Sequence, residues 1–210
     1  MTAVHLLPYG DAAVLAEVGG VAEALALHAD LVARPPAGTV DLVPGERTVL
    51  VRFDPGATSA AVVRADLASR PVHAGADDRR TSPDVLRIPV VYDGADLAGL
   101  ARRQGRSVAD LVAAHQRVQW RVAFVGFAPG FGYLVPESGD WREVARRDDP
   151  RTSVPAGSVA AAGRYTGVYP GSSPGGWQLL GRTDLAVWDV GREPPALLVP
   201  GTRVRFEAVP

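Results

Sequence analysis

The 210-residue chain contains no cysteine and no lysine. Without cysteine it has no disulfide, no thiolate nucleophile and no cysteine-bound zinc. Without lysine it can form no Schiff base and cannot contain the lysine of a phosphate-binding loop. All of its fixed positive charges are therefore arginines, whose planar, forked guanidinium suits carboxylates.

The chain also lacks a large charge of either sign. Its formal net charge is -1 and it has no basic run, which argues against binding to nucleic acid. Charged residues interrupt every apolar run well before the roughly 18 residues of a membrane span, so none is predicted. The first residues, MTAVHLLPYGD, show neither a basic leader nor a cleavage site, and we expect a cytoplasmic protein.

Metal-ligand spacing is missing as well. The four histidines are His5, His28, His73 and His115, and no two of them lie three to five residues apart. We therefore predict no metal site.

The first part of the chain alternates between strand and helix patterns. They are a strand at 12–18, a helix from residue 21, a hairpin over 39–53 that turns at Pro44 and Gly45, and a helix at 59–69. The first helix has one predicted apolar face made of Val21, Leu25, His28, Leu31 and Val32. The order β-α-β-β-α matches a ferredoxin-like sandwich, and the run at 85–92 either closes it or opens the next part.

The second part consists of short apolar runs separated by Pro-Gly and Gly-Gly pairs. Two helices come first, at 96–105 and 107–116, and Ser107 and Asp110 form a capping box for the second. The runs that follow are 117–127, 130–135, 153–162, 177–180, 184–190 and 196–207. Such a pattern favours an antiparallel barrel or sandwich. With the polar stretch 71–83 as a linker, we expect one domain over 1–83 and another over 84–210.

The stretch FVGFAPGFGYLVP, residues 124–136, places aromatic residues around a turn. Pro129 and Gly130 predict a type II turn, which exposes backbone groups, while Phe127, Phe131 and Tyr133 can wall a space. One interpretation is a ligand pocket and the other is an aromatic plug at the end of a barrel.

Small residues dominate the segment 157–163, which predicts a flat surface that a ligand, a loop or another chain must cover. Arg151 and Arg164 bracket it; either could hold a carboxylate, or both could be solvated surface residues. Ser158 has no histidine near it in sequence, which argues against a serine hydrolase.

His115 closes the second capped helix, where a structural role at the helix terminus is the simplest interpretation. Because its unperturbed pKa is about 6.5, it could also act as a general base near the aromatic turn. Asp148 and Asp149 lie in a charged run and are interpreted as a solvated loop.

Three long motifs occur in order, GFAPGFGYL, VPAGSVAAAGRYTGVYP and SPGGWQLLGRT, preceded by YGDAAVLAEV near the start. Together they closely resemble the family of the B-type subunit of 5-oxoprolinase, also called allophanate hydrolase subunit 1 or KipI. This resemblance implies an α+β protein with an N-terminal ferredoxin-like domain followed by a cyclophilin-like antiparallel β-barrel. It also implies a larger second subunit, which is the C-type subunit of 5-oxoprolinase or allophanate hydrolase subunit 2, together with a third, A-type subunit of 5-oxoprolinase.

The resemblance implies a subunit that is inactive alone and acts in the ATP-dependent opening of 5-oxoproline to glutamate, or on the similar amide allophanate. No cofactor is expected in this chain, since ATP would be handled by another subunit. Two alternatives are a KipI-like inhibitor of a sensor histidine kinase and a module that binds proline-containing peptides. We expect His115 to transfer protons, and we expect the substrate to contact Phe127, Pro129, Gly130, Phe131, Tyr133, Arg151, Ser158, Arg164, Tyr169 and Gln178.

Overall fold

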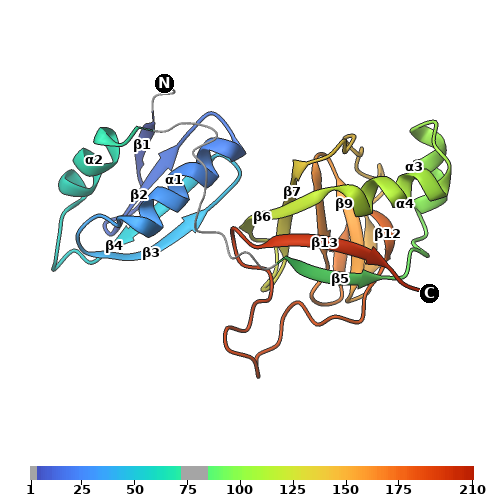
Figure 1. The fold of residues 1–210 in the computed structure, drawn as a ribbon. Helices are drawn as coiled ribbons and strands as arrows, with labels where there is room; N and C mark the ends of the chain where they lie inside the picture. The colour runs from blue at the N-terminus through green and yellow to red at the C-terminus, as the bar shows by residue number, and fades with distance from the viewer. Residues whose placement is uncertain (1–3, 72–84) are drawn as a thin grey trace. The chain divides into compact units, whose positions relative to one another are not determined.

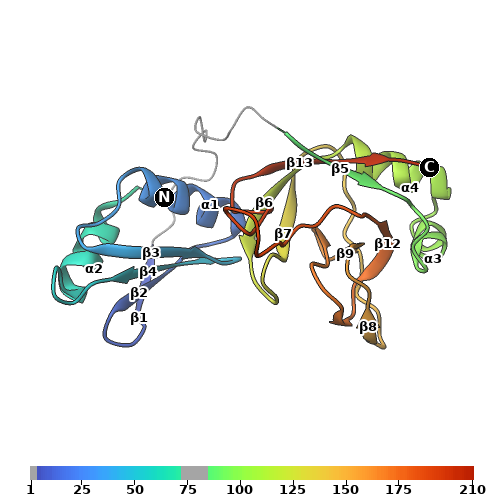
Figure 2. The ribbon, with the colours of Figure 1, turned by 90° about the horizontal axis from the view of Figure 1, so that it is seen from below.

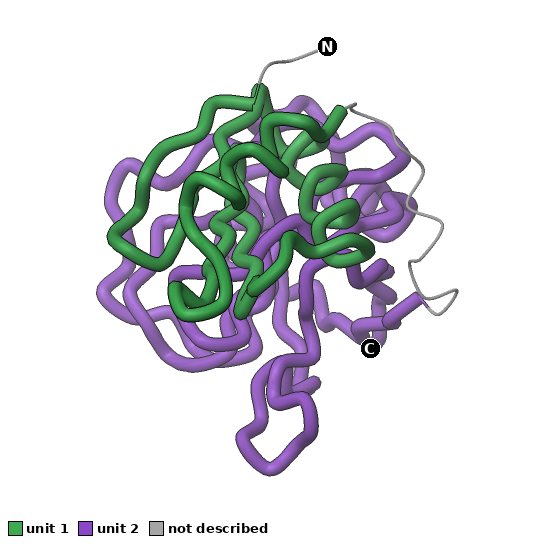
Figure 3. Tube along the Cα trace, turned by 90° about the vertical axis from the view of Figure 1, so that its left-hand side faces the viewer, with its two compact units in different colours: residues 1–80 green, residues 81–210 purple. Residues whose placement is uncertain are grey.

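The computed structural model describes residues 4–71 and 85–210. The chain divides into two compact units, Met1–Arg80 and Thr81–Pro210 (Figure 3). The predicted domain boundary at 83/84 and nearly all of the predicted linker fall in 72–84, outside the described residues. No helix in the described ranges is long and apolar enough to cross a membrane.

The first unit is a four-stranded antiparallel sheet with two helices, in the order β1-β2-β4-β3 (Figure 1). Its elements are β1 (His5–Pro8), β2 (Ala13–Glu17), α1 (Val21–Ala33), β3 (Thr39–Pro44), β4 (Thr48–Phe53) and α2 (Ala60–Ser69). One apolar cluster contains buried residues from both helices and from the sheet, including Val14, Leu27, Val51 and Leu67. Both helices therefore cover the same face.

The element β1 was not predicted, and it explains how this sheet is completed. The sequence indicated β-α-β-β-α and left the run at 85–92 open as a closing strand. In the structure β1 pairs antiparallel with β2, at the edge where a ferredoxin-like sheet has its last strand. The run near 85–92 contributes instead to the second unit.

The predicted apolar face of α1 was partly wrong. The buried residues are Val21, Ala24, Leu27 and Leu31, whereas Val32 is 60% exposed. His28 is only partly buried and is not the core histidine that the pattern suggested. The buried stripe passes through Ala24 and Leu27 rather than through Leu25 and His28, and it keeps the spacing of three to four residues of one helix face.

The second unit is a seven-stranded, barrel-like sheet in the order β12-β9-β10-β7-β6-β13-β5 (Figure 2). Its strands are β5 (Leu86–Val90), β6 (Gln119–Val125), β7 (Gly132–Ser138), β9 (Ser158–Ala162), β10 (Tyr165–Val168), β12 (Gln178–Arg182) and β13 (Arg203–Ala208). A bridge between Val91 and Arg182 connects the two edges of the sheet, so the barrel is nearly closed. The expected α+β class and barrel are confirmed.

Two helices and a two-stranded ribbon complete this unit. The helices α3 (Leu97–Arg103) and α4 (Val108–Arg117) precede β6, and the Ser107 side chain accepts a hydrogen bond from the Asp110 N–H as predicted. The short strands β8 (Arg151–Val154) and β11 (Ser173–Gly175) form a separate ribbon.

The predicted strand at 184–190 is wrong, because only Trp188 makes a bridge there, with Ala196. Nearby Pro194, Pro195 and Pro200 have no N–H to donate to a ladder.

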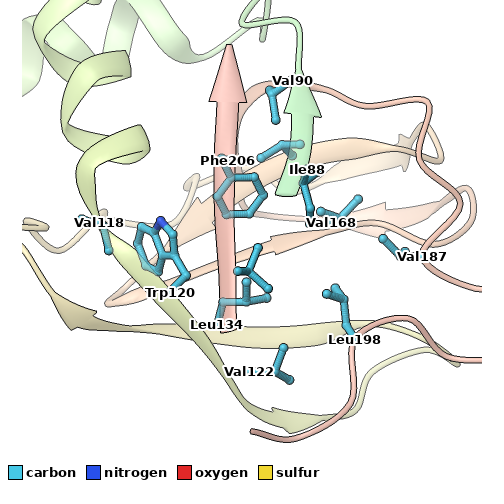
Figure 4. Packing of buried hydrophobic residues seen from close by; sticks show 12 residues of the cluster. Ile88, Val90, Val118, Trp120, Val122, Leu134, Val168, Val187, Leu198 and Phe206 are labelled. Atoms are coloured by element: carbon cyan, nitrogen blue, oxygen red, sulfur yellow. The ribbon is translucent and has the colours of Figure 1, made fainter. Parts of the chain in front are cut away.

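The barrel interior is filled by branched aliphatic residues and two large aromatic ones. Ile88, Trp120, Leu134, Val168 and Phe206 converge from five strands and are fully buried (Figure 4). Side chains alternate along a strand, so residues next to these point to the opposite face. That opposite face carries the candidate site.

Candidate functional site

The aromatic turn has the predicted geometry. The Phe131 N–H donates to the Ala128 carbonyl at 3.0 Å, and Gly130 has φ +80, as position i+2 of a type II turn requires. A Cβ at Gly130 would lie 2.6 Å from the Cβ of Trp188, so glycine is also needed for this close approach. Phe127 has φ +69, which is rare for a residue with a side chain, and it is 61% exposed.

An aromatic pocket of about 200 Å³ opens beside this turn. Its walls come from the turn, from β7, from the loop before β8, from the residue after β10 and from the segment between the end of β11 and the start of β12. They are Phe127, Phe131, Tyr133, Arg146, Tyr169, Gly175, Gly176 and Trp177. Four of these, Phe127, Phe131, Tyr133 and Tyr169, were predicted as substrate contacts, and the structure brings them together.

Strand alternation explains why the pocket and the barrel core do not compete for the same side chains. Leu134 and Val168 point into the barrel, whereas their neighbours Tyr133 and Tyr169 belong to the aromatic cluster. The small residues of β9 serve both faces: Val159 packs in the barrel core, and Ala160 packs under Phe131 and Trp177. The predicted flat surface is thus covered by the chain's own aromatic side chains.

Phe131 forms the centre of the cluster. Its ring lies edge-on to those of Phe127, Tyr169 and Trp177, with centroid separations of 5.4, 5.3 and 5.3 Å. Gly167 makes room for it, because a Cβ there would lie 3.1 Å from the Phe131 ring and 2.9 Å from the Gly132 carbonyl oxygen. The aromatic walls are therefore fixed by packing against the sheet.

Arg146 supplies the charge of this pocket, and sequence reasoning missed it. Its side chain is exposed, and the described residues provide it with no ion-pair partner. Burial raises the pKa of the Tyr133 and Tyr169 hydroxyls, and the nearby Arg146 charge opposes that rise only in part. At neutral pH the pocket therefore offers one free guanidinium and two protonated hydroxyls as hydrogen-bond donors.

Arg151, a predicted carboxylate holder, holds a carboxylate of the protein itself. Its two terminal nitrogens lie 2.8 and 2.9 Å from the two oxygens of Asp96. Arg147 and the Leu179 N–H also donate to Asp96, each at 2.8 Å. Burial disfavours the charged form of Asp96, but these hydrogen bonds outweigh it and lower the pKa of that carboxyl. The prediction that Arg151 binds substrate is therefore replaced by a structural role, in which it ties β8 to the start of α3.

A second, polar cavity of about 420 Å³ adjoins this ion-pair cluster. Arg146 lines both cavities, and Gln178 lines only the polar one. The Gln178 side chain donates to the Ala145 carbonyl at 3.0 Å, so its amide already has a partner. Asp148 and Asp149 are exposed at the rim of this cavity, as expected for a solvated loop.

His115 is enclosed in the barrel and does not reach the pocket. It is 1% exposed, and its ring stacks on Phe206 with a centroid separation of 4.5 Å. Thr166 donates its hydroxyl proton to the Ala160 carbonyl, so it accepts from His115 Nε2–H at 2.9 Å. Nδ1 then accepts from the Tyr92 hydroxyl at 2.7 Å. Burial lowers the pKa of His115 to about 3, and the predicted proton-transfer role is not compatible with this position.

The remaining predicted residues lie apart from the aromatic pocket. Ser158 is buried at the start of β9, and Arg164 is exposed in the turn between β9 and β10. Pro129 and Gly130 line an apolar cavity of about 440 Å³, together with Val125, Gly126, Phe127, Ala128, Trp188 and Ala196. Across the described ranges, no three His, Asp or Glu side chains cluster in a way that could hold a metal ion.

The chain matches one family model and is similar to several known proteins. The family model described as carboxyltransferase domain, subdomain C and D, matches residues 4–198. A Bacillus subtilis protein, named as the B subunit of 5-oxoprolinase, is 34% identical over 205 residues, which cover 90% of this chain and 83% of that protein. Its Escherichia coli O157:H7 namesake is 49% identical over 126 residues, or 58% of this chain and 56% of that one.

Longer proteins contain a related part. The crystal structure of TTHA0988 superposes with a TM-score of 0.76 at 38% identity, and the match covers 95% of this chain but 40% of that chain. Urea amidolyase of Saccharomyces cerevisiae is 23% identical over 202 residues, which make up 11% of its length. The matched part is therefore about half of the E. coli protein and less than half of these two longer chains.

Proposed function

Because the chain belongs to the family of the carboxyltransferase domain, subdomains C and D, we propose that it is the B-type subunit of an ATP-dependent 5-oxoprolinase. Its aromatic pocket would hold 5-oxoproline, a five-membered lactam that carries one carboxylate. This proposal depends chiefly on Arg146, a cation with no ion-pair partner among the described residues. It lies at the edge of a pocket whose other walls are aromatic side chains and two glycines.

The size of the pocket supports a compact ligand. Its volume of about 200 Å³ is smaller than the roughly 300–1,000 Å³ typical of sites for drug-sized molecules. A small ring would pack against Phe131 and Trp177, and its carboxylate would accept from the Arg146 guanidinium. The lactam carbonyl would accept from Tyr133 or Tyr169, whose hydroxyls remain protonated because their pKa values are raised.

The same lining supports a subunit that needs partners. Hydrolysis adds water to the lactam carbonyl, breaks the C–N bond and delivers a proton to the leaving nitrogen. Among the described residues that line the pocket, the only titratable groups are an arginine and tyrosines, and none of them is a base at neutral pH. In this proposal, proton transfer and ATP binding fall to other subunits, a larger second one and a third.

An amidohydrolase acting on allophanate is the closest alternative, supported by the relation to urea amidolyase. Allophanate is also a small planar amide with one carboxylate, so the same pocket would accept it. Turnover of each substrate by the assembled enzyme, with and without ATP, distinguishes the two.

Substitution of Arg146 tests the pocket assignment. In the complex purified with its partner subunits, Arg146→Ala removes a hydrogen bond between charged groups worth about 1.5–3 kcal/mol, which corresponds to a roughly 10- to 150-fold higher KM. Arg164→Ala is the matched control, because it removes another exposed arginine, one outside the pocket, and should leave KM unchanged. An effect of Arg164→Ala without one of Arg146→Ala would overturn the assignment.

A further inference from the structure

A second apolar feature lies next to the aromatic pocket. We call it the Trp188 surface. It comprises the lining of the 440 Å³ cavity, which is Val125–Gly130, Trp188 and Ala196, and the exposed Val190 two residues after Trp188 in the same loop. Val190 is 85% exposed and Phe127 is 61% exposed. Surface aliphatic and aromatic groups around an apolar cavity are typical of a binding surface rather than of a folding requirement.

The loop that presents Val190 is held in one conformation. The Arg192 guanidinium donates to the carbonyls of Ala186, Pro194 and Pro195 at 3.1, 3.3 and 2.8 Å. Main-chain bonds add to this, from Asp189 N–H to Pro195 and from Leu197 N–H to Val187. Figure 1 shows the segment between β12 and β13 extending away from the barrel, and the tube in Figure 3 shows the same projection. A rigid, projecting loop with an apolar tip is preorganised for a partner, because little conformational entropy is lost on binding.

Phe127 joins the Trp188 surface to the aromatic pocket, since it lines both cavities. Its left-handed backbone, at φ +69, costs on the order of 1–3 kcal/mol unless surrounding contacts stabilise it. Its ring packs edge-on against Phe131 and Tyr169 on the pocket side. A molecule that covers the Trp188 surface would bury the other side of the ring and form the missing wall of the pocket.

The occupant is indicated by the coverage of TTHA0988. There the part equivalent to this chain occupies 40% of a longer polypeptide, so the other 60% is covalently attached to it. We propose that the Trp188 surface binds a separate second subunit equivalent to that remainder, and that this subunit places an apolar side chain in the 440 Å³ cavity beside Phe127. The proposal concerns docking alone and does not require 5-oxoproline to be the substrate.

The experiment begins with the full-length tagged chain purified from its native host. A co-purifying polypeptide counts only if its sequence aligns with the part of TTHA0988 outside the matched 40%. Hydrogen exchange is then compared between the chain alone and this complex. We expect slower exchange at 125–130 and 184–197 in the complex, and protection confined to other segments would refute the proposal.

Two substitutions make the test quantitative. Val190→Asp places a charge on the docking surface and should weaken the complex about tenfold or more, without changing the thermal midpoint of the chain. Val62→Asp is the control, because Val62 is a 54% exposed valine on α2, in the other unit. It should leave the affinity unchanged, and equal weakening by both variants would overturn the assignment.

Another occupant has a distinct outcome. Protection of the Trp188 surface that grows with the concentration of the chain alone would identify a second copy. This result, or the absence of any co-purifying TTHA0988-like polypeptide, would refute the proposal, and neither readout depends on turnover.

Discussion

Acidification tests whether His115 is a core residue or a proton-transfer residue. The structure encloses its ring between Phe206 and three other aromatic rings, and both of its nitrogens have hydrogen-bond partners. Burial lowers the pKa of His115 from 6.5 to about 3. A general base at a working site would instead titrate near neutrality.

Whether acid raises or lowers the free energy of unfolding depends on which state, native or unfolded, binds the proton more readily. Above pH 6.5 the histidine is neutral in both states and contributes no pH dependence. Below its unfolded pKa the unfolded chain takes up a proton that the native chain takes up only near pH 3, so the free energy of unfolding falls as pH falls. At about 1.4 kcal/mol per pH unit, acidification to about pH 5 should remove roughly 2 kcal/mol of stability.

Urea denaturation at about pH 7, 6 and 5 measures this loss while most carboxylates remain ionised. His115→Gln lowers stability at every pH because the amide fits the site less well, but it should abolish this part of the slope. An undiminished slope in His115→Gln, or an NMR titration of His115 near pH 6.5, would show that the ring reaches water and would reopen the catalytic interpretation.

Three further predictions concern packing, the ion-pair cluster and the regulatory alternative. Gly167→Ala should lower the free energy of unfolding by about 1–3 kcal/mol and weaken ligand binding, because its Cβ would lie 2.9 Å from a backbone oxygen. Gly171→Ala is the control: its Cβ would have no atom within 4 Å, so it should change neither the denaturation nor the binding measurement. Asp96→Asn should cost about 2–4 kcal/mol in urea denaturation, because it leaves Arg147 and Arg151 without their carboxylate; unchanged stability would show that the cluster is not structural. Added to an autophosphorylating sensor histidine kinase, the chain should leave the rate of phosphate incorporation unchanged, and inhibition at equimolar concentration would favour the KipI-like role.

The elements with strong local signals were predictable from sequence. The hairpin over β3 and β4, the Ser107 cap and the type II turn at Pro129 and Gly130 all depend on residues a few positions apart. The strand β1 was missed because HLLP is only four residues long and shows no alternation. It forms a strand because it pairs with the edge of β2, and this pairing depends on tertiary structure rather than on the local sequence.

The arginines show why the site was less predictable than the fold. Arg146, Arg151 and Arg164 look alike in sequence, since each lies near small or polar residues close to the glycine-rich motifs. Their difference arises from Asp96, which lies 55 residues before Arg151 and takes both of its terminal nitrogens. Only the folded chain shows that the protein itself occupies Arg151 and that Arg146, not Arg164, lines the aromatic pocket; the charged run around Arg146 gave no hint of it.

The two faces of the sheet separate folding from recognition, and this has a consequence for how the site can change. Tyr133 and Leu134 are neighbours, yet one lines the pocket and the other fills the barrel, so a one-residue shift of β7 would exchange them. The register shifts at irregularities beside the site, between Val122 and Phe124 and between Leu179 and Gly181. The apolar walls are thereby fixed to the core, whereas Arg146 projects from a loop outside the regular strands. If the pocket binds its substrate as proposed, substitutions in that loop would alter which anion is bound without disturbing the barrel. Selectivity among small anionic amides would then map to residues around Arg146 rather than to the aromatic cluster.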